Sequence, residues 1–127
     1  MITKALQARK LNLKNPSESR EFGHGRLEIA NIENYSVARV TLKPGWDWEK
    51  DLRPLAHTDT CQSEHVQYVL QGRLAVTMDD GTELELGPGD AVFIPPGHTA
   101  HVIGDEEFVA IDFTGLKDYA KTLPPNK

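Results

Sequence analysis

The chain has 127 residues, of which 39% are hydrophobic and 26% charged, and these values fit a single soluble globular domain. Its net charge is −5 and its basic residues are not clustered, which argues against nucleic acid and anionic membrane surfaces as partners. The apolar runs are too short to cross a membrane, and the first residues carry no apolar signal segment. With Cys61 as the single cysteine there is no internal disulfide, so we expect a cytoplasmic protein.

The beginning of the chain is expected to be an arm followed by a domain. Residues 1–20 are polar and predict an N-terminal arm that could add an edge strand, whereas residues 21–127 predict one domain. Two segments, 27–31 and 38–42, alternate apolar and polar side chains as half-buried strands do. The next segment, 46–48, alternates again and is expected to place two tryptophans on one face.

The rest of the chain predicts more short strands at regular spacing. Turn residues such as Asp79-Asp80-Gly81 separate them, and this rhythm is typical of an all-β sandwich or barrel. Only residues 116–123 predict a helix, which the two prolines after it would end. The predicted strands of this part are 66–70, 74–78, 84–86, 91–94, 102–103 and 108–113.

Two stretches in this order resemble the two motifs of the cupin family. The segment from Gly89 to His98 reads GDAVFIPPGH, similar to the family's Gly-Asp turn, strand, Pro-x-Gly and histidine. The segment YVLQG, which ends at Gly72, resembles the end of the first motif. The resemblance covers roughly residues 40–113. It implies an all-β fold, the cupin double-stranded β-helix or jelly-roll barrel, here with a short C-terminal helix, and a metal site inside the barrel.

The register set by Gly72 assigns candidate ligands before the first motif. His65 stands where the family has its acidic ligand, and Cys61 stands where it has its second histidine. Asp59 occupies the position of the first histidine, and His57 lies two residues before it. All four have the same parity, so a straight strand would point them to one face. His57, Cys61 and His65 are therefore the predicted metal ligands of this segment, with Asp59 as an alternative.

The second motif offers two histidines for the same site. The family's histidine usually comes three residues after the glycine of Pro-x-Gly, where this chain has Ala100. His98 follows Gly97 directly and keeps the parity of the expected position, so a shortened turn would make it the ligand. His101 has the opposite parity and is expected to face outward, although it remains the alternative. Together with the first motif, the predicted metal set is His57, Cys61, His65 and His98.

The donor types indicate the metal and the pocket. Imidazole and thiolate favour one divalent transition metal per chain, such as zinc, iron or nickel, over magnesium. Gln67 and Val69 share the face of His65 and, with Trp48, are predicted to line a substrate pocket. The resulting hypothesis is a metal-binding cupin that acts on or binds a small polar molecule, as a metal-dependent oxygenase or isomerase. The alternative is a non-catalytic binding or sensing module, and either is expected to form a homodimer.

Overall fold

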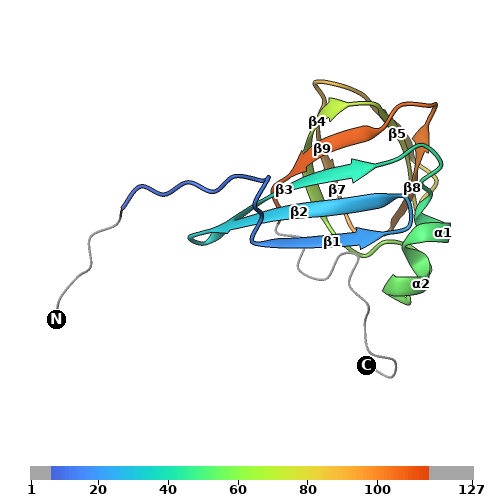
Figure 1. The fold of residues 1–127 in the computed structure, drawn as a ribbon. Coiled ribbons are helices and arrows are strands. Elements are labelled where there is room, and N and C mark those ends of the chain that lie inside the picture. Colours follow the sequence, from blue (N-terminus) through green and yellow to red (C-terminus); the bar gives the residue numbers. More distant parts are fainter. Residues whose placement is uncertain (1–6, 115–127) are drawn as a thin grey trace.

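The computed structural model describes residues 7–114 and shows an all-β barrel with two short helices. Figure 1 shows the elements in chain order around one interior, with the helices at one end of the barrel. The bounds are β1 (Glu18–Phe22), β2 (Gly25–Ile32), β3 (Tyr35–Leu42), α1 (Trp48–Asp51), α2 (Arg53–Ala56), β4 (His65–Gln71), β5 (Arg73–Met78), β6 (Glu83–Leu86), β7 (Ala91–Ile94), β8 (His98–Ile103) and β9 (Phe108–Asp112).

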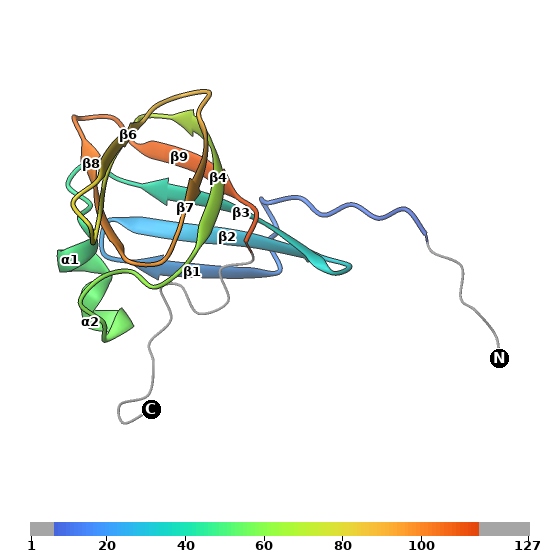
Figure 2. The ribbon, with the colours of Figure 1, turned by 180° about the vertical axis from the view of Figure 1, so that it is seen from behind.

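The strands form two antiparallel sheets that face each other. One sheet has six strands in the order β1-β2-β3-β9-β4-β7, and the other has three in the order β6-β5-β8. Figure 2, from behind, shows β4 and β7 curving towards β8 and β6. The predicted all-β barrel is confirmed, whereas the helix predicted for residues 116–123 lies outside the described residues.

The N-terminal arm joins the sheet earlier than the expected domain start at residue 21. Strand β1 pairs with β2 from Glu18↔Ile29 to Phe22↔Gly25. The next hairpin joins β2 to β3 through a tight turn in which Glu33 has a left-handed backbone, with φ 51°. These long antiparallel pairs form one wall of the barrel.

The segment around the two tryptophans is not the extended run that the alternation predicted. Asp47 forms an isolated bridge with His101, and Trp48 then begins α1, whose first turn Asp47 caps by accepting from Glu49 N–H at 2.9 Å. Both indoles are nevertheless buried, at 2% exposure each. Helices of only four residues carry too little periodicity to be read from sequence.

The core fills the space between the sheets and is built from the inward positions of nearly every strand. Leu27, Ile29, Val69, Val76 and Phe108 are almost completely buried there. Such burial is the main force that holds the two sheets together. Within residues 7–114, no helix is long and apolar enough to span a membrane.

Candidate metal centre

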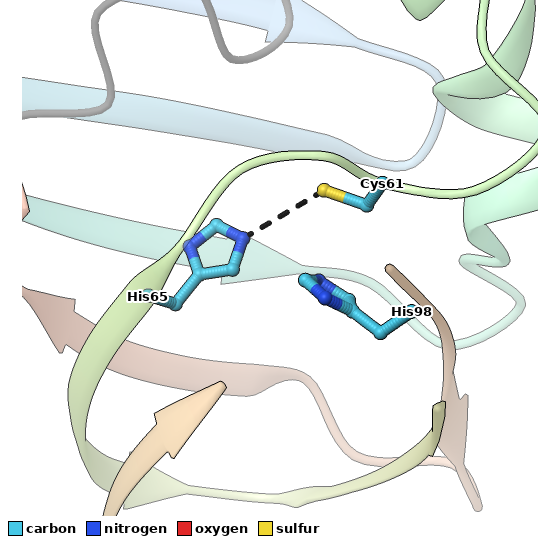
Figure 3. Close-up of side chains that lie close together, drawn as sticks. All are labelled: Cys61, His65 and His98. Atoms are coloured by element: carbon cyan, nitrogen blue, oxygen red, sulfur yellow. Dashed lines mark hydrogen bonds between the residues drawn. The ribbon is translucent and has the colours of Figure 1, made fainter. Parts of the chain in front are cut away.

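Three buried donor side chains meet at one end of the barrel interior. Cys61 lies in the loop before β4, His65 is the first residue of β4, and His98 is the first residue of β8. One ligand atom from each lies within 4.8 Å of the other two. Figure 3 shows the thiol and both imidazoles turned towards one another.

Backbone hydrogen bonds hold Cys61 against the turn that precedes β8. The N–H of Cys61 donates to the carbonyl of His98 at 2.7 Å, and the N–H of Gly97 donates to the carbonyl of Cys61 at 2.7 Å. Gly97 has φ +93°, a conformation that glycine adopts without strain. The shortened Pro-Gly turn therefore places His98 directly beside the loop that carries the cysteine.

Both imidazole rings are oriented through Nδ1. His98 Nδ1 lies 2.8 Å from the carbonyl of Pro95, which can only accept, so this nitrogen is the donor. His65 Nδ1 lies 3.0 Å from Asp112 Oδ2. In each ring, Nε2 is then the nitrogen that can offer a lone pair, and in His65 it lies 3.9 Å from Cys61 Sγ. Histidines that bind metals are usually anchored in this way.

The electrostatics of the cluster favour a charged pair in the metal-free protein. Burial raises the pKa of the Cys61 thiol, but hydrogen bonds from His65 and His98 outweigh it and lower this pKa to about 6. Burial lowers the pKa of His65, but its bonds to Asp112 and Cys61 outweigh that and raise this pKa to about 9. Both shifts favour the thiolate and the protonated imidazole in the metal-free protein, so His65 must release a proton before Nε2 can bind a metal.

Asp112 was not foreseen from the sequence. It is completely buried on β9, and its Oδ2 accepts from both His65 Nδ1 and Gln67 Nε2, the latter at 2.9 Å. Burial raises its pKa, but the His65 hydrogen bond and charge outweigh burial and hold this pKa below its usual value. The available signal was the alternation of Phe108, Ala110 and Asp112, which puts a carboxylate on the apolar face of the last strand.

The other candidate ligands lie outside the cluster. His57 is exposed and ends α2 in a left-handed conformation, and Asp59 is exposed and paired with Arg53 at 2.9 Å. His101 is exposed on β8, as its parity predicted. The helical turn before the loop breaks the parity argument for His57 and Asp59, because the segment is not a straight strand. The structure thus brings together three of the four predicted ligands.

A small cavity of about 30 Å³ adjoins the two histidines. Of the residues predicted to line a substrate pocket, Gln67 and Trp48 line this cavity, and Trp46 lines it as well, whereas Val69 is fully buried and is not among the lining residues. The remaining walls are apolar and comprise Val40, Leu42, Leu74, Ile94, Ala100 and Phe108. This volume holds about two water molecules, so only a small group can enter without movement of the walls.

The donor set fits a transition metal. Donors that share one ion at about 2.0–2.3 Å lie roughly 3.3–4 Å apart, and the 3.9 Å between Cys61 Sγ and His65 Nε2 agrees with that spacing. Two imidazoles and a thiolate are ligands that zinc, iron and nickel accept, and all three side chains are buried.

Comparisons with known proteins agree with the fold. The sequence profile described as "Cupin domain" matches residues 38–114. No curated protein matches the sequence. A structure of unknown function from Rhizobium leguminosarum bv. viciae 3841 is 23% identical with a TM-score of 0.55, and the match covers 85% of this chain and 97% of that one.

Two solved structures with described activities are also similar. A sugar phosphate isomerase from a cupin superfamily, from Silicibacter pomeroyi DSS-3, is 19% identical with a TM-score of 0.59, and the match covers 83% of this chain and 74% of that one. A polyketide cyclase from Streptomyces resistomycificus is 17% identical with a TM-score of 0.55, covering 93% and 83%. At these identities the similarity extends to the fold alone.

Proposed function

The chain belongs to the cupin domain family, and from that premise we propose that it binds one divalent transition metal ion on Cys61, His65 and His98 and acts on a small polar molecule. The observation that carries the proposal is the convergence of three buried donors, with Nδ1 of both imidazoles committed elsewhere. Three protein ligands leave a coordination position open, which is typical of catalytic sites.

The residues of the chain would prepare the site in separate ways. Asp112 holds the proton on His65 Nδ1 and so keeps Nε2 directed at the cluster. The carbonyl of Pro95 does the same for His98. Trp48 and the apolar walls give the cavity beside the histidines a mostly apolar lining. A zinc, iron or nickel ion bound there would supply Lewis-acid chemistry or, for iron, oxygen chemistry.

The reaction class is proposed in broader terms than the metal site. A metal-dependent isomerase or oxygenase acting on a small polar molecule fits the open position, and the isomerase among the similar structures supports the first of these. A non-catalytic binding or sensing module is the second candidate, and the small volume of the cavity favours it. Turnover of substrate by the metal-loaded protein would distinguish the two.

Metal analysis of the purified protein tests the proposal directly. We expect about one zinc, iron or nickel ion per chain, and its loss when His65 or His98 is replaced by alanine. His101→Ala and His57→Ala are matched controls, because both histidines are exposed and should be dispensable for metal. A wild-type protein without stoichiometric metal, or a His101→Ala variant that loses it, would contradict the proposal.

Assembly and location belong to the same proposal. A homodimer is supported by an uncharged apolar face on the outside of β4, β7 and β9. A cytoplasmic location is supported by the single Cys61, which is buried and free.

A further inference from the structure

Two of the residues that line the cavity carry a buried polar atom without a hydrogen-bond partner. Among the described residues, the buried side-chain atoms that make no hydrogen bond are Trp46 Nε1 and Gln67 Oε1. Both residues line the cavity beside His65 and His98, and they are 2% and 7% exposed. Buried polar groups nearly always have a partner, so this donor and this acceptor indicate something that occupies the cavity.

The orientation of the Gln67 amide is determined by Asp112. Its Nε2 donates to Asp112 Oδ2 at 2.9 Å, and a carboxylate only accepts hydrogen bonds. Turning the amide over would bring two oxygens together, so Oε1 is the atom left to accept a bond. The Trp46 indole nitrogen can only donate. The residues that line the cavity therefore include one fixed donor and one fixed acceptor.

This pair selects a particular chemical group. A hydroxyl can accept from an indole N–H and donate to an amide oxygen, so this one group matches the chemistry of both atoms. A carboxylate or an ether oxygen has no proton for Gln67 Oε1. The size of the cavity restricts the bound part to a few atoms, and its walls are apolar.

We propose that Trp46 and Gln67 form a recognition subsite for a hydroxyl group of a small hydroxylated ligand, next to the metal centre. The proposal rests on the proposed function in one respect, because the ligand is then the small polar molecule on which the metal centre acts. It names the class of that molecule as a compact alcohol or polyol and excludes a bare carboxylate at this position.

The test follows the Trp46 indole N–H by nuclear magnetic resonance of the ¹⁵N-labelled protein after incubation with zinc. The two tryptophans of the chain give two indole signals, and Trp46→Phe assigns them. The probes are ethylene glycol, its ether 1,2-dimethoxyethane, which cannot donate, and acetate, an anion that cannot donate. We expect a saturable shift of the Trp46 signal with ethylene glycol and affinity about five-fold lower for either other probe.

Variants separate the hydrogen bonds from the apolar walls. Gln67→Met removes the acceptor at similar volume and should weaken glycol binding about five-fold, as should Trp46→Phe when binding is followed by calorimetry. Trp48→Phe is the matched control, because Trp48 lines the same cavity but its indole nitrogen is not among the unpartnered atoms. It should weaken binding less than Trp46→Phe does.

Two results would overturn the subsite. One is a Trp46 signal that no probe shifts, which means that the cavity holds water only. The other is equal binding of all three probes. Metal content measured on the same samples keeps the two proposals apart. Stoichiometric metal without selective glycol binding contradicts the subsite alone, whereas selective glycol binding by a protein that takes up no metal contradicts the metal function alone.

Discussion

Asp112 is the residue whose replacement best separates positioning from metal binding. Asp112→Asn keeps the shape of the side chain but weakens the acceptor that orients His65. We expect metal affinity to fall about 10- to 100-fold, measured by competition with a chelator. The pKa of His65 in the metal-free variant should also fall, because the carboxylate helps to raise it. In a variant that is still folded, a lower pKa of His65 comes from the lost carboxylate and not from a general loss of structure.

The control is another aspartate of the same region. Asp59 is exposed and paired with Arg53, so Asp59→Asn should change neither the metal affinity nor the pKa of His65. Equal losses in both variants would contradict the role of Asp112 and would favour a general effect of charge.

The charged pair in the cluster also predicts how the stability of the metal-free protein depends on pH. The pKa of Cys61 is lowered from 9.0 to about 6, so its contribution is present at high pH and is lost as pH falls through 6. The pKa of His65 is raised from 6.5 to about 9, so its contribution is present at low pH and is lost as pH rises through 9. Between pH 6.5 and pH 9 the two contributions change in opposite directions and largely cancel, because the folded and the unfolded protein bind nearly the same number of protons.

Urea unfolding of the metal-free protein across this range measures the effect. The unfolding midpoint of the wild-type protein should change little between pH 6 and pH 9, because the contributions of Cys61 and His65 offset each other. In Cys61→Ala no thiol offsets His65, so the midpoint should fall as pH rises from 6.5 towards 9, because Asp112 still raises the pKa of His65. A midpoint in the variant that follows the wild-type profile throughout would show that the pair contributes nothing.

At the scale of elements, the alternation of apolar and polar residues predicted correctly which side chains of the long strands are buried. The faces of β4 followed the expected parity, with His65, Gln67 and Val69 buried and Tyr68 and Leu70 outward. The predicted meeting of Cys61, His65 and His98 agrees with the structure. The two motifs together indicate which distant strands lie side by side, and residue spacing alone does not carry this information. The short helices α1 and α2 were missed, and α2 turns His57 outward.

Long-range pairing also explains why Asp112 was missed. Gln67 and Asp112 are directly opposite each other on β4 and β9, strands that are far apart in the chain. The local sequence of β9 does not indicate which strand will pair with it. The alternation could have shown that Asp112 points inward, but not that it would contact His65.

The turn between β4 and β5 depends on one glycine. Gly72 has φ +81°, and a Cβ built there would lie 2.2 Å from the carbonyl oxygen of Glu107. Because that oxygen belongs to the backbone, Gly72→Ala would force the turn or the start of β9 to move. We expect a loss of unfolding free energy of roughly 3 kcal/mol or more, measured by urea unfolding.

Gly81 is the matched control for this turn. It has φ +91°, but a Cβ there would have nothing within 4 Å. Gly81→Ala should therefore show the backbone strain alone, about 1 kcal/mol. Equal losses in the two alanine variants would mean that contact with Glu107 is unimportant.

At the scale of the whole molecule, the described residues of the barrel form an outer face without charge on β4, β7 and β9. The outward positions of three neighbouring strands all carry uncharged side chains. Val66 and Phe93 are directly opposite each other and are 41% and 56% exposed, and Tyr68 is 44% exposed. The other members are Leu70, Ala91, Val109 and Ile111. A contiguous apolar face of this kind usually marks an interaction site.

A second copy of the chain is the partner that this face favours. A patch without charge requires an equally apolar surface opposite it, and the same face of another copy provides one through two-fold symmetry. The face also ends at β7, an edge strand of the six-stranded sheet, so it is accessible from the side. We therefore expect the mass of two chains by light scattering at micromolar concentration.

Charges placed in this face should separate the copies. Phe93→Lys and Tyr68→Lys each bury a charge at the expected interface, so either should shift the mass to that of one chain while metal content stays unchanged, because both side chains point away from the interior. Tyr35→Lys is the matched control, since Tyr35 is 74% exposed in the β2–β3 hairpin and should leave the dimer intact. A wild-type mass of one chain would contradict the dimer, and a dimer that survives both lysines would place its interface elsewhere.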